Sequence, residues 1–399
     1  MIERRPVERV LQVHTRYRQP GGEDQVVDAE RVLLETAGVD VGQVIFDNAD
    51  LRESRSLAGD LMLAASAIWS RSATRRVRVA IKASRPQVVH VHNTFPAASP
   101  SVYTAAAAEG IPVVQTLHNY RMVCPAATTF RGGRACTDCV GKAIAIPAVI
   151  HACVRDSHSQ SAAAAATLAI HRGLGTFARR IDLYLALTAF QRDLLVAGGL
   201  PAARVRVVPN FLEPDPGDRA DGRAGIVFVG RLSPEKGLIT LLDAAALVPR
   251  LVRVIGDGPL RAAVEAAAAD AKVDYVGHLD RPAVHAAMGR ALAVVVPSIW
   301  FEGFPIVLAE AFATGTPVIA SRIGSLAELV EDGRTGLLAE PGDATGLADR
   351  LRWARDHPTD MRRMGQHARK RYESAYTGST HLAALQDAYA AVARDGRAS

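Results

Sequence analysis

Four charged residues in the second half of the chain have the types and the spacing to hold a diphosphate and hydroxyl groups. Arg231 and Lys236 follow a short β-branched run, and Lys236 lies where a helix is expected to begin. Two cations beside the N–H groups of a helix suit a diphosphate by charge and by hydrogen bonding. Glu302 precedes a helix that Pro305 opens, and Glu310 lies inside that helix. Both carboxylates can accept hydrogen bonds from hydroxyl groups, although surface cations and glutamates at this distance also arise without a function.

Glycines mark the turns between predicted strands and helices. Gly230 ends one strand, Gly256 and Gly258 flank an aspartate in the next turn, and Gly21 and Gly22 follow the first strand of the chain. Glycine lets the backbone approach a ligand closely, but ordinary turns use the same residues. None of these turns is a GxGxxG or a Walker loop, which disfavours a dinucleotide oxidoreductase.

Two His-Asn pairs each end a predicted strand in the first half of the chain, at His92-Asn93 and at His118-Asn119. A single histidine is more often structural than catalytic, but two at strand ends facing one cleft favour a functional site. The sequence contains no GxSxG motif, no paired carboxylates across a helix and no DxD motif. No protein nucleophile therefore stands out.

All four cysteines fall within thirty residues, at Cys124, Cys136, Cys139 and Cys153. Thiolates in pairs, one of them with C-x2-C spacing, suit tetrahedral zinc. The flanking segment TTFRGGRACTDCVGK is polar and rich in glycine, as expected of a loop without a core of its own. Structural zinc, small buried thiols and a redox pair are the three alternatives, with structural zinc favoured.

Short β-branched runs alternate with longer Ala- and Leu-rich segments of helical period, which indicates parallel sheets covered by helices. In the first half this pattern predicts a helix over 23–37 and strands over 7–14, 87–92, 111–117, 182–187 and 205–208. In the second half it predicts strands over 225–229, 251–255, 273–276, 293–296 and 317–320. The predicted fold class is α/β, with two doubly wound, Rossmann-like domains facing each other across a cleft.

The predicted boundaries follow the changes in composition. An N-terminal domain covers 1–210 with a Cys-rich insertion at 119–155, a linker rich in Asp, Pro and Gly covers 211–223, a C-terminal domain covers 224–371, and a terminal helix covers 372–399. Leu382, Leu385, Tyr389 and Val392 recur at three- and four-residue intervals and form one apolar stripe. That stripe requires a surface on which to be buried.

The second half resembles a known family. The segments VGRLSPEKG, IGDGPLR, PSIWFEGFPIVLAEAFATGTPVIAS and EDGRTGLL are similar to the C-terminal domain of family 4 glycosyltransferases, the retaining GT-B enzymes. The likeness covers most of residues 225–340, in the order and spacing of the family. Pro305 stands where many members have glycine, and it suits the start of a helix.

The resemblance implies a donor and roles for the residues above. The donor would be a nucleotide-diphosphate sugar: Arg231 and Lys236 would bind its diphosphate, Glu302 its sugar hydroxyls and Glu310 its ribose. The backbone of the segment Gly303, Phe304, Pro305, Ile306 and Val307 would lie near the sugar and phosphate, with the turns at Gly21, Gly22, Gly230, Gly256 and Gly258 beside the donor.

On the acceptor side, the resemblance places His118 beside the reaction centre, and Arg121 is a candidate for the acceptor or its phosphate. Family members carry out a front-face reaction in which the departing phosphate takes the acceptor proton, generally without a catalytic metal. The resemblance also implies a terminal helix that crosses back onto the N-terminal domain. Some members of the family that assemble polysaccharides carry a similar cysteine-bearing insertion.

Composition limits the class of protein and its partners. The chain has 399 residues, of which 49% are hydrophobic and 22% charged, a balance typical of a globular protein. Its longest apolar runs fall far short of the roughly 20 residues that span a bilayer, and the N-terminus shows no secretory signal, so a cytoplasmic location is expected. The net charge is +6, but no basic run is interleaved with aromatic residues, which disfavours nucleic acid as a partner. The acceptor is expected to be a glycan, a lipid-linked glycan or a small molecule.

The segment 52–85 holds eight basic and two acidic residues around apolar positions. It is either an ordinary amphipathic surface helix or a contact with an anionic membrane surface, at the inner face of the membrane. For the whole chain, the alternatives to a retaining glycosyltransferase are a GT-B epimerase or phosphorylase and a non-catalytic sugar-nucleotide-binding partner protein. A phosphorylase would need a lysine for pyridoxal phosphate, and the chain has only five lysines.

Overall fold

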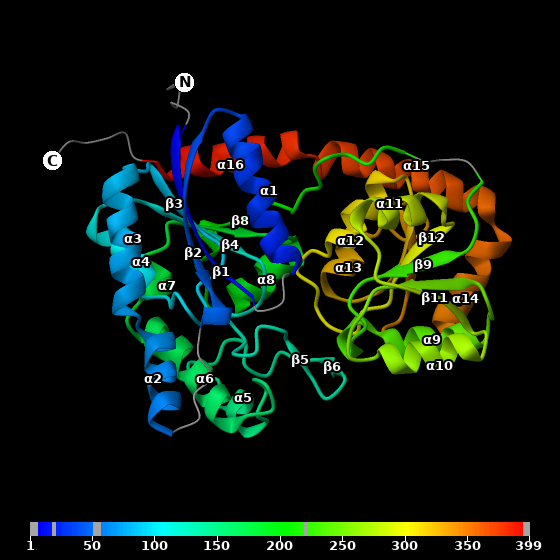
Figure 1. Ribbon diagram of the computed structural model, residues 1–399, viewed down its shortest axis with the longest axis horizontal. Helices are drawn as coiled ribbons and strands as arrows, with labels where there is room; N and C mark the ends of the chain where they lie inside the picture. Colours follow the sequence, from blue (N-terminus) through cyan, green and yellow to red (C-terminus); the bar gives the residue numbers. More distant parts are fainter. Residues whose placement is uncertain (1–6, 18–20, 51–56, 219–221, 394–399) are drawn as a thin grey trace. The chain divides into compact units, whose positions relative to one another are not determined.

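A computed structural model describes residues 7–17, 21–50, 57–218 and 222–393 of the chain. The chain forms two compact units. The first contains the described residues up to Thr128, then Thr137–Pro209 and the residues from His381 onward; the second contains Thr129–Cys136 and Asn210–Thr380. Figure 1 shows one sheet flanked by helices in each unit.

The sheet of the first unit is parallel and has the strand order β2-β1-β3-β4-β7-β8. Its strands are β1 (Arg9–Arg16), β2 (Asp40–Asp47), β3 (Val88–Val91), β4 (Val113–Leu117), β7 (Leu183–Ala186) and β8 (Val205–Val207). This is the order of a flavodoxin-like doubly wound sheet, which reverses direction between β1 and β3. The carboxyl ends of those two strands therefore form the edge at which such sheets bind ligands.

Helices cover both faces of this sheet. They are α1 (Gly22–Thr36), α2 (Leu57–Ile68), α3 (Arg71–Ser84), α4 (Val102–Ala108), α5 (Ile146–Ile150), α6 (His158–Gly173), α7 (Thr176–Arg179), α8 (Ala189–Ala197) and α16 (Gly378–Val392), with short 3-10 turns η1 (Asn48–Asp50) and η2 (Ala202–Arg204). Leu385, Ala388 and Tyr389 of α16 are buried in one apolar cluster with residues of β1, β3, β4 and β7. The terminal helix thus completes the core of the first unit, beside α1 (Figure 1).

The sheet of the second unit has the order β11-β10-β9-β12-β13-β14, the Rossmann arrangement. Its strands are β9 (Ile226–Val229), β10 (Val252–Ile255), β11 (Val273–Gly277), β12 (Ala293–Val296), β13 (Val318–Ser321) and β14 (Gly336–Ala339). The direction of winding reverses between β9 and β12. Its helices are α9 (Leu238–Ala246), α10 (Arg261–Ala269), α11 (Arg281–Arg290), α12 (Ile306–Ala313), α13 (Gly324–Leu329), α14 (Ala344–Asp356) and α15 (Pro358–Ala375), with the 3-10 turn η3 (Pro234–Lys236).

The structure confirms two Rossmann-like sheets and every strand predicted in them, but adds elements that the pattern did not reveal. The strands β2 and β14 close one edge of each sheet, and a two-residue hairpin joins β5 (Phe130–Arg131) to β6 (Arg134–Ala135). The tail is not one helix over 372–399, because α15 ends at Ala375 and α16 begins at Gly378. Residues 219–221 of the expected linker lie outside the described residues.

Candidate functional site

The two predicted partners of the donor, Lys236 and Glu302, meet in the second unit. Lys236 ends η3 after strand β9, and Glu302 lies in the loop that joins β12 to α12. The Lys236 Nζ donates a hydrogen bond of 2.8 Å to Glu302 Oε1. Because β9 and β12 flank the point where the sheet reverses, this ion pair lies where open α/β sheets bind ligands.

Glu302 is held ionised in a buried position. Ser298 Oγ donates to the same carboxylate oxygen over 2.7 Å. Burial alone would raise the pKa of Glu302, but the ammonium of Lys236 and the hydrogen bonds from Lys236 and Ser298 hold it below its usual value. The carboxylate can therefore accept a hydrogen bond from a hydroxyl group at neutral pH.

The loop that carries Glu302 leads directly into helix α12. Pro305 is the N-cap of this helix, and Phe304 is buried with its ring 5.1 Å from that of Tyr376. Ile306 and Val307 begin the helix and are partly exposed, so their N–H groups lie at its positive end. The loop is fixed to η3 by a hydrogen bond of 3.0 Å from Ile299 N–H to the Glu235 carbonyl.

Glu310 lies further along α12 and has partners that sequence reasoning missed. Its Oε1 lies 3.3 Å from Arg281 Nε and 3.2 Å from His285 Nε2, both on α11. The cost of burying this carboxylate is thus offset by an ion pair and a hydrogen bond. Arg281 and His285 stand four residues apart, on one face of their helix, a spacing that could have identified them.

The glycine turns of this unit bring backbone segments into close contact. A side chain at Gly256 would place its Cβ 1.9 Å from the Gly230 carbonyl oxygen, and one at Gly258 would come within 2.7 Å of Leu232 backbone atoms. These glycines therefore pack the ends of β9 and β10 together. Arg231 follows Gly230 with an exposed side chain, and among the described residues it forms no ion pair.

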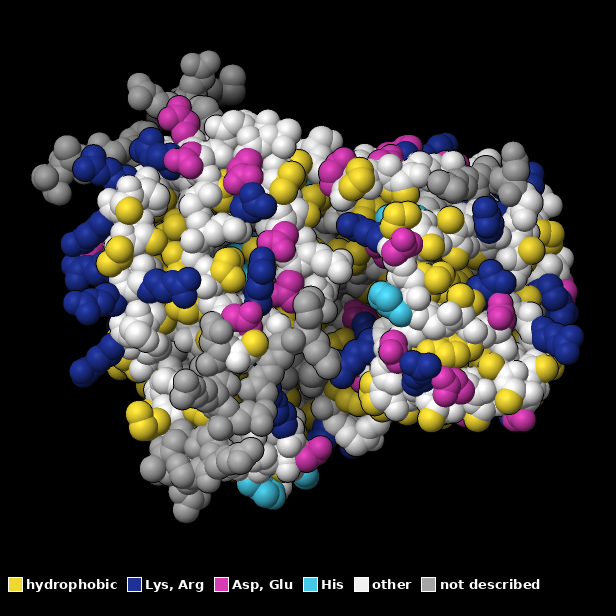
Figure 2. All heavy atoms as spheres, viewed as in Figure 1, with side chains coloured by type: hydrophobic (Ala, Val, Ile, Leu, Met, Phe, Trp, Pro, Cys, Tyr) yellow, Lys and Arg dark blue, Asp and Glu magenta, His cyan; other side chains and the backbone are white. Residues whose placement is uncertain are grey.

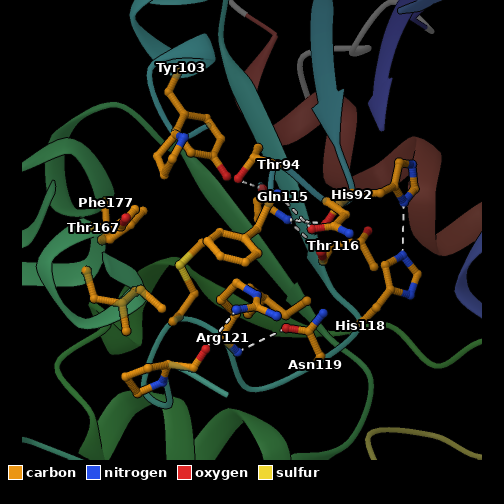
Figure 3. Close-up of a pocket in the computed structure, with 18 residues that line it drawn as sticks. His92, Thr94, Tyr103, Gln115, Thr116, His118, Asn119, Arg121, Thr167 and Phe177 are labelled. Carbon is orange, nitrogen blue, oxygen red and sulfur yellow. Dashed lines mark hydrogen bonds between the residues drawn. The ribbon is translucent and has the colours of Figure 1, made fainter. Parts of the chain in front are cut away.

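In the first unit, the two predicted histidines are hydrogen-bonded to each other. His92 follows β3 and His118 follows β4, and His92 Nδ1 lies 3.0 Å from His118 Nε2. Figure 3 shows this pair at one side of a pocket of about 50 Å³ that Phe95, Tyr103, Arg121 and other residues also line. Burial lowers the pKa of His118 well below its usual value, and the neighbouring imidazole of His92 lowers it further. His118 is therefore a neutral imidazole at pH 7.

The glycine turn of the first unit is fixed by Asp24. Gly21 is the N-cap of α1, and its N–H donates a hydrogen bond of 2.9 Å to Asp24 Oδ2. His14 Nε2 donates a hydrogen bond of 2.8 Å to Asp24 Oδ1. Burial alone would raise the pKa of Asp24, but the hydrogen bonds from His14 and Gly21 lower it. Gly22 follows as the first residue of α1, and Pro20 lies outside the described residues.

Arg121 lies in a largely neutral environment. Its guanidinium stacks 4.0 Å from the centre of the Phe95 ring and donates to the Pro125 carbonyl, but its Nε has no hydrogen-bond partner. The nearby Glu23 accepts from Tyr17 Oη over 3.0 Å, and burial raises the pKa of Glu23 to about 8. Glu23 is thus protonated at pH 7 and provides no counter-charge.

The four cysteines are divided between the two units: Cys124, Cys139 and Cys153 lie in the first and Cys136 in the second. Among the described residues, the metal-capable group of three or more His, Cys, Asp or Glu side chains is Glu30 with His90 and His92, not a set of cysteines. Cys139 is buried and packs with Cys153 in a small apolar cluster that also contains Ala145 and Ala148. Cys139 and Cys153 thus pack beside Ala148 of α5 and Ala165 of α6, and the zinc site stays a prediction.

Comparison with known proteins places the chain in a family. Residues 9–210 match the glycosyl transferase 4-like domain, and residues 213–371 match the glycosyl transferases group 1. The chain belongs to the group 1 glycosyltransferases of the family 4 type. Its two-sheet architecture is accordingly the GT-B fold.

Individual relatives and solved structures agree with this family. A glycogen synthase of Mycobacterium tuberculosis is 33% identical over 266 residues, which cover 62% of this chain and 63% of that protein. The D-rhamnosyltransferase WbpZ of Pseudomonas aeruginosa is 34% identical over 38% of this chain and 41% of its own length. The matched parts thus span less than two-thirds of these relatives.

Among solved structures, HepE of Anabaena in complex with UDP and glucose has a TM-score of 0.65 at 17% identity, covering 96% of this chain and 98% of that one. Sucrose-phosphate synthase of Thermosynechococcus elongatus has a TM-score of 0.67 at 20% identity, with the same coverage. Both similarities concern the fold. Within the described residues of the glycosyltransferase, no helix is both long enough and apolar enough to cross a membrane.

Proposed function

We propose that this glycosyltransferase transfers a sugar from a nucleotide-diphosphate sugar to a hydroxyl group of an acceptor, with retention of the anomeric configuration. The observation that carries the proposal is the buried ion pair between Lys236 and Glu302 at the start of α12. It combines a cation for a leaving diphosphate with a carboxylate for sugar hydroxyls, next to the N–H groups of a helix.

In this proposal the second unit binds the donor. Arg231 and Lys236 bind the diphosphate, and the exposed Arg231 side chain is available because no described residue pairs with it. Glu302 accepts hydrogen bonds from the sugar, and the backbone of Gly303–Val307 lies against the sugar and phosphate. Glu310 accepts from the ribose hydroxyls with Arg281 beside it.

The acceptor side is assigned to the first unit. His118 forms a hydrogen bond with the transferred sugar, Gly21 and Gly22 contact the diphosphate, and Arg121 binds the acceptor. The buried, unpartnered Nε of Arg121 and the neutral Glu23 beside it support this role, because a partly buried cation without a counter-charge favours an anionic or strongly polar ligand.

The reaction needs no protein nucleophile. The acceptor oxygen forms its bond to the anomeric carbon on the face that the diphosphate leaves, and the bond between that carbon and the phosphate oxygen breaks. The acceptor proton passes to the departing phosphate oxygen. Arg231 and Lys236 stabilise the negative charge that grows on the diphosphate, which is how preorganised cations accelerate such steps.

Incubation with a panel of nucleotide sugars and hydroxyl acceptors tests this function. We expect release of a nucleoside diphosphate with one donor, and NMR of the product should show the donor's anomeric configuration. Product of the opposite configuration would refute retention, and nucleoside diphosphate release unchanged in a Glu302→Ala variant would refute the assigned site.

We also propose that α3 contacts an anionic membrane surface. This helix contains no acidic residue, and five of its basic side chains are exposed: Arg71, Arg75, Arg76, Arg78 and Lys82. Figure 2 shows Lys and Arg side chains in dark blue along the edge of the first unit where Figure 1 draws α3. The exposed Trp69 and Val79 provide apolar groups beside them. Residues 52–56 of the expected basic segment lie outside the described residues.

Vesicle flotation tests the membrane contact. The protein should float with vesicles that contain phosphatidylglycerol and not with pure phosphatidylcholine, and the Arg71→Glu, Arg75→Glu double variant should lose binding. Arg253→Glu, at an exposed arginine of the second unit, is the matched control. Equal binding by both variants would exclude α3 as the contact.

A further inference from the structure

A buried chain of polar side chains runs through the first unit from α1 to His118. It begins at Glu30, which is 1% exposed and accepts a hydrogen bond of 2.9 Å from Gln12 Nε2. His92 Nε2 lies 3.3 Å from the same carboxylate oxygen, Oε1. The opposite ring nitrogen of His92, Nδ1, lies 3.0 Å from His118 Nε2, as the dashed line in Figure 3 shows.

The charge of Glu30 determines where the proton of His92 lies. Burial alone would raise the pKa of Glu30, but the neighbouring His90 and His92 and the hydrogen bond from His381 hold it well below its usual value, so the group is a carboxylate. His92 Nε2 forms no aligned hydrogen bond, but at 3.3 Å the carboxylate attracts a hydrogen on this nitrogen and would repel a lone pair there. His92 therefore carries a proton on Nε2.

His92 has no second ring proton. Burial lowers the pKa of His92 to about 4, so the ring is neutral at pH 7 and its Nδ1 is a hydrogen-bond acceptor. The hydrogen bond to His118 then requires a proton on His118 Nε2. Because His118 is also neutral, its Nδ1 is left without a proton.

We propose that Glu30 is a positioning residue that acts through His92 to keep the ring proton of His118 on Nε2, so that His118 presents Nδ1 as an acceptor to a hydroxyl group of the bound sugar. The part that concerns the sugar rests on the function proposed above. The part that concerns the ring protons is a property of the unliganded protein and can be tested without a substrate.

Other polar groups around Glu30 come from β3 and α16. His90 Nδ1 lies 3.0 Å from Glu30 Oε1 and 2.7 Å from Tyr389 Oη, while His90 Nε2 lies 2.8 Å from Thr116 Oγ1. His381 Nε2 lies 3.3 Å from Glu30 Oε2. Tyr389 forms no hydrogen bond with His92 or His118 among the described residues, so it offers a control for loss of a buried hydrogen bond in the same network.

The nearest titratable group on β1 is His14, whose Nε2 is already bonded to Asp24. His14 packs edge-on against His92, with ring centres 6.2 Å apart, and is not a step in the chain from Glu30 to His118. The polar chain from Glu30 to His118 therefore consists of one carboxylate and two imidazoles.

A bound divalent cation would reverse the pattern. Zinc held by Glu30, His90 and His92 would take His92 Nε2 as a ligand, move the His92 proton to Nδ1 and so place the His118 proton on Nδ1. The tautomer of His118 thus distinguishes a carboxylate-directed chain from a metal site at the same residues.

NMR of protein labelled with ¹⁵N-histidine tests the proposal. Long-range ¹H–¹⁵N correlation should show His118 neutral at pH 7 with its proton on Nε2, with the signal assigned by its loss in His118→Gln. A proton on Nδ1 or a charged ring would overturn the proposal, and this measurement needs no change to the network itself.

Variants test whether Glu30 sets the tautomer of His118. In Glu30→Gln the amide can turn either its oxygen or its NH₂ group toward His92, so His118 should become a mixture of tautomers, whereas Glu30→Asp should restore the single form. Tyr389→Phe should leave His118 as in the wild type. An unchanged His118 tautomer in folded Glu30→Gln would show that Glu30 does not set it; if that variant does not fold, a Glu30→Asp protein with mixed tautomers gives the same refutation.

Steady-state kinetics then test whether the position of the His118 ring proton affects sugar transfer. With the donor found by the panel, Glu30→Gln should lower kcat by on the order of tenfold or more with little change in the donor KM, since a histidine in the wrong tautomer loses its hydrogen bond in the reacting complex. Tyr389→Phe should stay within about twofold of wild type. A Glu30→Gln enzyme with mixed tautomers and wild-type kcat would refute the role toward the sugar. Absence of any transfer in wild type would refute the proposed function and leave the NMR result to decide on the ring protons.

Discussion

The two units use similar sheets but place their polar groups differently. In the first unit, polar residues lie inside the sheet itself: Gln12, His14, His90 and Gln115 are all buried within strands. In the second unit the buried strand residues are apolar apart from Ser321, and the polar groups of the candidate site lie in the loops beyond the strand ends, as Lys236 and Glu302 do. One site depends on the core of its unit and the other on its loops.

This difference determines how far a local change should spread. A hydrogen-bonded network inside a sheet couples its members, because an unpaired buried polar group is costly. A loop ion pair above an apolar sheet can be removed while the core beneath it stays packed. Changes in the first unit should therefore affect stability and activity together, and changes in the second should separate them.

The largest expected effect comes from removing α16. A chain ending after Thr377 loses the buried Leu385 and Tyr389 and two groups of the Glu30 network. Burial of large side chains of this kind contributes roughly 2–5 kcal/mol each, so the first unit should unfold and transfer should cease. Hydrogen exchange should show lost protection in β1, β3 and β4 with β9–β14 still protected.

A chain ending after Ala393, which keeps α16, is the control for that truncation. If the shorter chain kept full protection in β1 and β3, the core of the first unit would not depend on its last helix, and the contrast between the units would fail.

The next effect is loss of activity without loss of stability. Lys236→Ala and Glu302→Ala should each raise the transition-state barrier by roughly 2–4 kcal/mol, as expected for loss of one preorganised charge. The midpoint of thermal unfolding should change little in the Glu302 variant, because the ammonium of Lys236 is partly exposed and water can solvate it. Lys272→Ala, at an exposed lysine paired with Asp270, is the matched control and should behave as wild type.

Steady-state kinetics and calorimetry with the free nucleoside diphosphate would check both variants. Wild-type kcat and affinity in Lys236→Ala would place the diphosphate elsewhere, and a collapse in the stability of Glu302→Ala would show that the second unit couples its site to its core after all.

A smaller effect concerns pH. The pKa of Glu23 is raised by burial to about 8, so folding favours the protonated form. Its contribution to stability is fully present below the unfolded value and falls as the pH rises through about 8. Glu23→Gln keeps a neutral group at every pH, so its stability relative to wild type should increase between pH 5 and pH 8. Urea unfolding at both values measures this, and parallel curves would mean that Glu23 is ionised in the folded protein.

The smallest effect is expected in the cysteine segment. Cys139→Ala removes one buried atom from an apolar cluster and should cost about 1 kcal/mol, whereas Cys136→Ala, at a partly exposed position, should cost less. If the four cysteines held zinc, both variants would lose stability equally and metal analysis of the wild type would find zinc in equimolar amount.

Sequence reasoning predicted the parts of the fold that depend on periodicity and turns. The strand β12 was predicted to the residue, and the two sheets, the start of α12 at Pro305 and the apolar stripe of α16 were also anticipated. The strand β2 was missed because DVGQVIFD mixes polar and apolar residues at an edge of the sheet. The break between α15 and α16 was missed because neither Tyr376 nor Thr377 is a residue type that breaks helices.

The candidate site was predicted where a motif carried it and missed where tertiary contacts made it. Lys236 and Glu302 lie in recognisable segments, and the structure brings them together. Glu30 and His381 look like ordinary surface positions of their helices, and Tyr389 was predicted only as part of an apolar stripe. Only folding brings Glu30 and Tyr389 to His90 and His381 to Glu30. His90 and His92 lie two residues apart, and such residues share one face of a sheet. This spacing was the feature of the sequence that could have indicated a buried polar network.

The return of the chain to the first unit at His381 has a consequence for synthesis. A nascent chain emerges from its N-terminus, so the first sheet is made long before the helix that finishes its core. The second unit, Asn210–Thr380 with the hairpin segment, is complete while α16 is still being translated. Until then Val10, Val88 and Leu185 lack their Leu385 and Tyr389 neighbours, and Glu30 lacks His381. The unit whose first strand is made first is thus the one that finishes folding last, and a nascent chain of which residues up to Thr380 have left the ribosome should leave it open to proteolysis while the second unit resists.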